Sequence, residues 1–178
     1  MSYLPCELHC HTVHSDGDFT AAELQKAAAD DHLAIMALTD HNTFSGWDEL
    51  DDNIIPTIRG IEWTTYFGHM LVLGANDFVD WRDAKPDNID EKIKQVKAVG
   101  GLVGIAHPFQ LGSPLCTGGR WEFNVRDWRN VDYIEVWHQN LYSAKRENER
   151  ALELWTSLLD KGYKIAATYG RDWHREET

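Results

Sequence analysis

Short apolar runs alternate with helical patterns along most of the chain. The apolar runs cover residues 5–11, 33–39, 54–62, 69–73, 102–106, 133–137 and 164–168. Each run has the length of a strand and is bounded by polar or turn-forming residues. Strands that alternate with helices are typical of α/β proteins. The sequence therefore predicts an α/β fold with about seven strands.

Three segments carry the start and stop signals of helices. The sequence Thr-Ala-Ala-Glu at residues 20–23 has capping-box spacing and predicts a helix that runs to about Asp31. The same spacing recurs in Asn-Ile-Asp-Glu at residues 88–91, which opens a helix that the following Gly-Gly pair should end. Ser143 is expected to cap a third helix, which Gly162 ends.

Composition limits the kind of protein that this sequence can form. The chain has 178 residues, a net charge of −12, a hydrophobic fraction of 43% and 8 tryptophans. This length and apolar content predict one folded domain over residues 1–178 and exclude a disordered chain. No apolar run approaches the roughly 18 residues that a membrane span needs. The acidic balance argues against nonspecific binding to nucleic acid.

Two further features indicate a cytoplasmic protein. The sequence starts without the basic and apolar regions of a secretory signal. Its three cysteines are an odd number and include no Cys-X-X-Cys pair, so they predict no disulfide framework. Such cysteine usage fits a reducing compartment.

Histidines and carboxylates recur at the ends of the predicted strands. The residues placed there, or in the loops that follow, are His9, His11, Asp16, His41, Glu62, His69, His107, His138, Asp172 and His174. The carboxyl ends of parallel strands lie on one face of a barrel, where functional sites form. Imidazole and carboxylate groups are suitable ligands for zinc, manganese or iron. The pattern therefore predicts a metal site on that face.

Some histidines keep a simpler interpretation. His14 lies in a loop and His32 at a helix end, and both are interpreted as ordinary solvated side chains. For His138, a role in binding metal or substrate and a purely structural role remain equally open. Cys6 and Cys10 alternate with the histidines of the first strand, so they should point to the opposite face and serve packing.

Six short motifs resemble those of the polymerase-and-histidinol-phosphatase (PHP) superfamily. In chain order they are His-Cys-His-Thr at 9–12, Ser-Asp-Gly at 15–17, Thr-Asp-His at 39–41, Gly-Ile-Glu at 60–62, Ala-His-Pro at 106–108 and Gly-Arg-Asp-Trp-His at 170–174. Together they cover nearly the whole chain. The stretches at 68–74, 79–81, 135–137 and 148–152 look like the carbaryl-hydrolase-like branch of that superfamily.

The resemblance implies a distorted (βα)7 barrel that binds two or three divalent metal ions, zinc, manganese or iron. The first ion would be held by His9, His11, Glu62 and Asp172. The second would be held by Glu62, His107 and His69, and the third by Asp16, His41 and His174. A barrel of this type normally adds further elements after its last motif, whereas this sequence ends soon after His174. We therefore expect a chain truncated at its C-terminus or an unusually small barrel.

The resemblance also implies a function. We expect a phosphoesterase that cleaves a small phosphate ester with water activated at the metal site. The third ion, or Arg171, where the family usually has Ser, would hold the developing oxyanion. His138, where the branch usually has Asn, or Asp40 would orient water or protonate the leaving group. The alternatives are a carboxyl-ester or carbamate hydrolase and a non-catalytic metal-stabilised module; the oligomeric state stays open.

Overall fold

The computed structural model describes residues 4–112, 118, 120–138 and 144–176. The strands are β1 (Cys6–Glu7), β2 (Ile35–Leu38), β3 (Thr57–Thr65), β4 (Gly68–Leu73), β5 (Leu102–Ile105), β6 (Tyr133–His138) and β7 (Ala166–Gly170). The helices are α1 (Ala21–Asp30), α2 (Ile89–Ala98) and α3 (Lys145–Asp160), with short 3-10 turns η1 (Trp47–Glu49) and η3 (Trp128–Asn130). No helix among these residues is long and apolar enough to cross a membrane.

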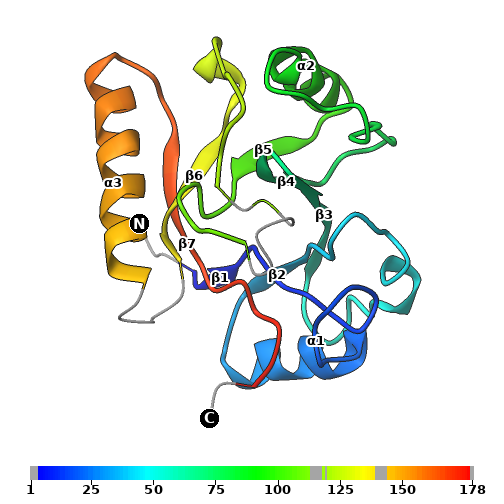
Figure 1. Cartoon of the computed structure of the whole chain (residues 1–178). Coiled ribbons are helices and arrows are strands. Elements are labelled where there is room, and N and C mark those ends of the chain that lie inside the picture. The colour runs from blue at the N-terminus through cyan, green and yellow to red at the C-terminus, as the bar shows by residue number, and fades with distance from the viewer. Residues whose placement is uncertain (1–3, 113–117, 119, 139–143, 177–178) are drawn as a thin grey trace.

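The strands form one sheet in which neighbours in sequence are neighbours in space. β1, β2 and β3 pair in parallel, as do β5, β6 and β7. β4 runs antiparallel to both of its neighbours. The sheet curls until the segments that follow β1 and β7 meet, where Cys10 pairs with Trp173 (Figure 1). The result is a distorted, nearly closed barrel, as the sequence predicts.

The structure corrects several predicted boundaries. The first strand covers only Cys6–Glu7 of the predicted residues 5–11, because the Glu7 carboxylate accepts hydrogen bonds from the backbone N–H groups of Leu8 and His9. β3 starts after Pro56, whose ring nitrogen has no proton to donate to a strand neighbour, and extends beyond the predicted end at Glu62.

The two predicted capping boxes have different outcomes. At α1, Thr20 Oγ1 accepts from the backbone N–H of Glu23, and the Glu23 carboxylate accepts from that of Thr20. At α2, the helix begins at Ile89 as expected, but the Asn88 side chain makes no capping bond, so the predicted capping box at residues 88–91 is wrong. Its amide instead accepts from the Lys85 backbone and donates to that of Asp83, outside the helix. Ser143, the expected cap of α3, lies outside the described residues.

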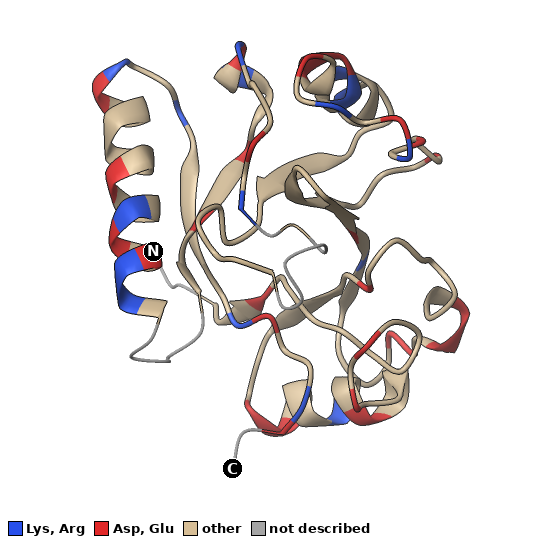
Figure 2. Cartoon of the chain, in the orientation of Figure 1, with Lys and Arg blue, Asp and Glu red and all other residues tan. Residues whose placement is uncertain are grey.

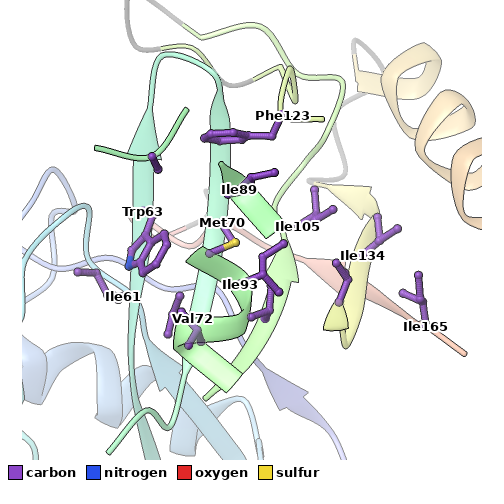
Figure 3. Packing of buried hydrophobic residues seen from close by; sticks show 14 of the residues in the cluster. Ile61, Trp63, Met70, Val72, Ile89, Ile93, Ile105, Phe123, Ile134 and Ile165 are labelled. Atoms are coloured by element: carbon purple, nitrogen blue, oxygen red, sulfur yellow. The ribbon is translucent and has the colours of Figure 1, made fainter. Parts of the chain in front are cut away.

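The two faces of the β3–β4 hairpin have different surroundings. Ile61 and Trp63 of β3 lie on the outer face and belong to the main hydrophobic core with Ile89 and Ile93 of α2 (Figure 3). Glu62 lies between them in sequence and therefore points to the opposite, inner face. The strand alternation thus gives β3 an apolar side that anchors α2 and a polar side that lines the barrel.

A smaller apolar cluster lies on the inner face. It contains Leu71 and Leu73 of β4 and Tyr133 of β6, all of them buried. Because Glu62 pairs with Leu71 and Gly60 with Leu73, this cluster lies on the same face as Glu62. The barrel interior therefore has an apolar layer directly beside the polar groups described below.

Charged residues of both signs are distributed over the chain. Figure 2 shows Lys and Arg interspersed with Asp and Glu along α3, with acidic segments also near α1 and α2. Lys145 pairs with Glu149 one turn along α3 at 3.9 Å. Mixed charges of this kind are typical of a solvated helix face.

Candidate metal centre

Glu62 lies at the centre of the polar cluster inside the barrel. Its side chain is fully buried, and its two oxygens contact five imidazoles. The contacts are Oε1 with His69 Nδ1 at 2.9 Å and His107 Nε2 at 3.2 Å, and Oε2 with His41 Nδ1 at 2.7 Å, His9 Nε2 at 3.4 Å and His11 Nε2 at 3.5 Å. Each oxygen thus faces a different set of histidines, as in a carboxylate that bridges two ions.

Asp172 approaches the same cluster from the segment after β7. Its Oδ1 atom lies 3.2 Å from His9 Nε2 and 3.0 Å from His11 Nε2. One ligand atom from each of His9, His11 and Glu62 also lies within 4.8 Å of the other two. These four residues are the set expected to hold the first ion.

A third group lies at the more exposed edge of the cluster. Asp16 Oδ1 is 3.0 Å from His174 Nε2 and 3.4 Å from His41 Nε2. Together with His11, these ligand atoms lie within 4.8 Å of one another. The structure thus brings together all nine predicted metal ligands, although their assignment to particular ions stays a prediction.

The antiparallel strand β4 explains how His69 reaches this cluster. His69 stands near the start of β4, whereas most of the other ligands follow the ends of parallel strands. In the hairpin, His69 pairs with Thr64, near the carboxyl end of β3. Reversing one strand therefore brings its first residues to the end of the barrel where the other ligands lie.

Several buried atoms of this cluster have no hydrogen-bond partner among the described residues. They are His9 Nε2, both ring nitrogens of His11, Glu62 Oε2, His107 Nδ1 and Asp172 Oδ1. Leaving buried polar atoms unsatisfied destabilises a fold by roughly 1–3 kcal/mol each. Imidazole nitrogens and carboxylate oxygens are the ligands that zinc, manganese and iron accept. The residues therefore fit divalent metal ions.

Two of the predicted ligands have unusual backbone conformations. His107 has φ of 25° and Asp172 has φ of 51°, both in the left-handed region that side chains with a Cβ atom rarely adopt. Such conformations persist where the surrounding structure imposes them, and they are frequent at functional sites. At both positions the strain accompanies a side chain that is directed into the cluster.

Glu135 on β6 is part of the site that the sequence analysis missed. Its Oε1 accepts a hydrogen bond from His9 Nδ1 at 2.8 Å, and its Oε2 accepts one from the backbone N–H of His107 at 2.9 Å. The available signal was a single carboxylate within the otherwise apolar and aromatic strand Tyr-Ile-Glu-Val-Trp. Carboxylates that orient ligand histidines are a general feature of metal sites.

The three predicted catalytic residues have different surroundings. Asp40 is buried, and its carboxylate accepts three hydrogen bonds of 2.7 Å, two from Thr12 and one from Ser15. His138 is buried with its Nε2 atom 3.8 Å from Asp172 Oδ2. The Arg171 guanidinium pairs with Asp31 at 2.8 Å and stacks on the ring of Trp173.

The charges of the cluster determine which groups are ionised. Burial alone would raise the pKa of Glu62, but the charges of His9 and His69 and the hydrogen bond with His107 lower it well below its usual value. Asp172 behaves in the same way, because His9 and His11 outweigh the effect of burial on its pKa. Both carboxylates are therefore ionised at neutral pH.

The buried imidazoles divide into two kinds. Burial lowers the pKa of His11 to about 4, and it lowers that of His138 to about 4 together with the charge of His107. Burial also opposes the charged form of His9, yet the carboxylates of Glu135, Asp172 and Glu62 raise its pKa well above the usual value. His11 and His138 are thus neutral at pH 7.

The chain is similar in sequence to two proteins of an archaeon. No protein-family model matches it. An uncharacterized protein of Methanocaldococcus jannaschii is 33% identical over 110 residues, which are 61% of this chain and 48% of that protein. A second one from the same organism is 26% identical over 153 residues, 77% of this chain and 85% of the other. The chain spans about half the length of the first relative.

Solved structures resemble the whole chain. A two-domain protein of Bacteroides vulgatus that contains a predicted PHP-like metal-dependent phosphoesterase has a TM-score of 0.71 at 21% identity, over 97% of this chain and 52% of that protein. A protein of Bifidobacterium adolescentis, named as a candidate metal-dependent phosphoesterase, has a TM-score of 0.65 at 20% identity, over 97% and 88%. An amidohydrolase of Chromobacterium violaceum, solved with bound sulfate and no metal, has a TM-score of 0.62 at 18% identity. The match covers 96% of this chain and 87% of the amidohydrolase.

These similarities concern the fold, because the identities lie near 20%. None of the three structures supports the expected carbaryl-hydrolase-like branch. The first of them does carry the PHP-like description that the sequence motifs suggest. The distorted seven-stranded barrel, with its histidines and carboxylates gathered at one end, therefore has a PHP-type fold.

Proposed function

We propose that this chain is a metal-dependent hydrolase that cleaves a small phosphate ester. The observation that supports this function best is the position of Glu62. Its two buried oxygens lie between separate groups of histidines, and several atoms around it lack hydrogen-bond partners among the described residues. A site that is built to bind two or three ions around one shared carboxylate suits hydrolysis more than it suits structural support.

Three groups of residues would hold the ions. His9, His11 and Asp172 would bind the first, His69 and His107 the second, and Asp16, His41 and His174 the third, with Glu62 shared between the first two. When bound, zinc, manganese or iron would supply positive charge and lower the pKa of a bound water towards about 7. The metal identities and their number belong to the proposal.

The protein's own residues would position these ligands and handle protons. Glu135 holds the ring of His9, so that Nε2 faces Glu62 and Asp172. Asp40, with three hydrogen-bond donors around its carboxylate, would keep the loop that carries Asp16 in place. His138, neutral and beside Asp172, is then suited to accept a proton from water or to orient it, rather than to protonate the leaving group.

The role proposed for Arg171 requires a rearrangement. Its guanidinium contacts Asp31 and Trp173 in the structure, and it would have to exchange the Asp31 contact for an anionic substrate. We keep this residue as a candidate for binding the oxyanion, since guanidinium groups recognise phosphate oxygens well.

Charge favours phosphate as the substrate group. Three divalent ions would bring six positive charges against the five negative charges of Asp16, Asp40, Glu62, Glu135 and Asp172. The site would then be positive although the whole chain carries −12. Bound ions dominate the local field, so an anionic ester would be attracted. The two phosphoesterase names among the structural neighbours agree with this preference.

A carboxyl ester or carbamate is the second candidate substrate. The observation in its favour is that one structural neighbour is named an amidohydrolase. The same ligand set would serve attack on a carbonyl carbon. Rates with p-nitrophenyl phosphate, a phosphodiester and an aryl carboxyl ester, measured with one metal-loaded preparation, would separate the two classes.

The decisive experiment combines metal analysis with that panel of substrates. We expect two or three equivalents of metal per chain and turnover of at least one phosphate ester. Asp172→Ala should lose most of the metal and the activity, whereas His32→Asn, an exposed histidine outside the cluster, should keep both. If the protein holds metal but hydrolyses no ester, the non-catalytic alternative gains support and this proposal is wrong.

A further inference from the structure

A cavity of about 250 Å³ lies next to the metal centre. It lies between the segment that follows β5 and the first turns of α3, and its lining includes His107, Gln110, His138, Glu147 and Asn148. His107 is a predicted metal ligand, so the cavity shares a wall with the metal site. His138 also lines it, and the Nε2 atom of this side chain is 3.8 Å from Asp172 Oδ2.

The cavity wall presents polar atoms without partners. Gln110 Oε1, Glu147 Oε2 and both ring nitrogens of His138 are buried, and none has a hydrogen-bond partner among the residues that the structure describes. His138 as a whole is only 3% exposed. The side-chain amide of neighbouring Asn148, in contrast, accepts a hydrogen bond from the backbone N–H of His138 and donates one to its carbonyl oxygen. Two oxygen acceptors and one imidazole therefore remain available to a bound molecule.

The carboxylate of Glu147 also lacks a cation. Across the described part of the chain it forms no ion pair. Arg146, the residue before it, is exposed, and the two other nearby cations have contacts elsewhere. Lys145 pairs with Glu149, and the Arg150 guanidinium lies 4.3 Å above the ring of Phe109. A carboxylate oxygen that is buried without a partner is costly unless a donor reaches it. An ammonium group would satisfy both its charge and its hydrogen-bonding capacity.

We propose that this cavity binds the leaving group of the ester and that this group is a small amino alcohol. The inference rests on the proposed function, because the phosphate would face the metal ions and the alcohol would extend past His138. The ammonium would donate to Glu147 and Gln110. The cavity lies just below the usual range of about 300–1,000 Å³ for ligand pockets, which suits a leaving group of a few heavy atoms.

The reaction at this site is ordinary hydrolysis. Water supplies the oxygen that replaces the alcohol oxygen on phosphorus, and the bond between phosphorus and the alcohol oxygen breaks. One proton of the water ends on the released alcohol. No oxidant, reductant or second substrate is required.

Binding of the alcohol alone tests the cavity independently of catalysis. Ethanolamine should shift the amide resonances of Gln110 and Glu147 in a two-dimensional NMR titration, while 1-propanol, which has a methyl group in place of the ammonium, should bind at least tenfold more weakly. Glu147→Gln should remove this difference. Glu149→Gln, two residues further along α3 and exposed, should leave it unchanged. Equal shifts with the two alcohols would overturn the inference.

Turnover then separates this inference from the proposed function. O-phosphoethanolamine should have a kcat/KM at least about tenfold above that of propyl phosphate, and Glu147→Gln should abolish the preference mainly through KM. If both esters are hydrolysed at equal kcat/KM, the inference fails and the proposed function stands. If neither of these esters nor any phosphate ester of the earlier panel is hydrolysed although ethanolamine binds to this cavity, the proposed function fails and a binding site remains. If p-nitrophenyl phosphate is hydrolysed but O-phosphoethanolamine is not, the inference fails and the proposed function stands.

Discussion

The Nδ1 atom of His9 donates a hydrogen bond of 2.8 Å to Oε1 of Glu135, and Nε2 on the opposite side of the ring faces Glu62 and Asp172. The bond fixes both the orientation of the ring and the nitrogen that is free to bind metal. Glu135→Gln should therefore lower metal affinity by about 10- to 100-fold. Competition with a chromophoric chelator would measure this. Glu122→Gln, a surface carboxylate, serves as the control, and equal affinities would contradict the role of Glu135.

Gly170 makes room for the same carboxylate. A Cβ atom at this position would lie 2.2 Å from Oε1 and 2.3 Å from Cδ of Glu135. Gly170→Ala should therefore displace Glu135, with a loss of about 1–3 kcal/mol in the free energy of unfolding and a fall in metal affinity. Gly162→Ala is a suitable comparison, since it changes a glycine of positive φ with open space around it. It should lower stability by backbone strain alone and leave metal affinity as in the unchanged protein.

Asp40 is expected to act on the metal centre through the loop that it holds. Asp40→Asn replaces an oxygen that accepts from Thr12 or Ser15 with an NH₂ group, which cannot accept. We expect roughly tenfold weaker binding of the ion held by Asp16 and little change at the others. Stepwise titration of the metal-free protein would resolve the sites. Asp18→Asn, an exposed residue of the same loop, should bind metal normally, and a uniform loss at all sites would argue against this role.

Metal binding should release protons. Burial would lower the pKa values of His41 and His107, but the carboxylate of Glu62 beside both rings outweighs it and raises them. These imidazoles keep their protons to higher pH than free histidine, and a metal ion must displace them. Affinity should therefore rise with pH between about 6 and 8 and fall as the pH is lowered. Calorimetry in two buffers of different ionisation enthalpy would count the protons; a heat that does not depend on the buffer would refute the prediction.

The cap of α1 gives a test of stability that is separate from the metal centre. Thr20→Ala removes the side chain that accepts from Glu23, and it should lower the free energy of unfolding by about 0.5–2 kcal/mol. Thr20→Ser retains the hydroxyl and should recover most of that loss. Urea denaturation of the metal-free proteins would measure both. If the two variants had the same stability, the capping bond would not contribute to stability in solution.

Local sequence patterns predict the strands well and their directions poorly. The apolar runs locate all seven strands among the described residues, because burial on the barrel wall requires apolar side chains. The reversal of β4 has no such signal, since the pairing of two strands depends on contacts across the sheet. The predicted capping box at Asn88 is wrong for a similar reason. Its side chain hydrogen-bonds to the backbone of Lys85 and Asp83 before the helix, and residue spacing alone cannot exclude such bonds.

The residues of the candidate site also divide into those that local sequence motifs predict and those that only the folded structure reveals. Motifs single out the nine predicted ligands because metal binding needs particular residue types, and the structure brings those residues together. Glu135 has no recognisable motif of its own, and its role appears only once β6 lies beside His9. Likewise, the cavity near Glu147 joins residues from the segment after β5 and from α3, which are distant in sequence.

The pairing of Cys10 with Trp173 joins the first and last parts of the sheet, and predicted metal ligands flank both partners. His9 and His11 come from one side of this seam, and Asp172 and His174 from the other. An ion held between them would act as a cross-link between segments separated by nearly the whole chain. Such a site cannot assemble until the last strand has been synthesised and docked, so metal uptake would be a late event in folding. Chelation would then open the barrel first along this seam.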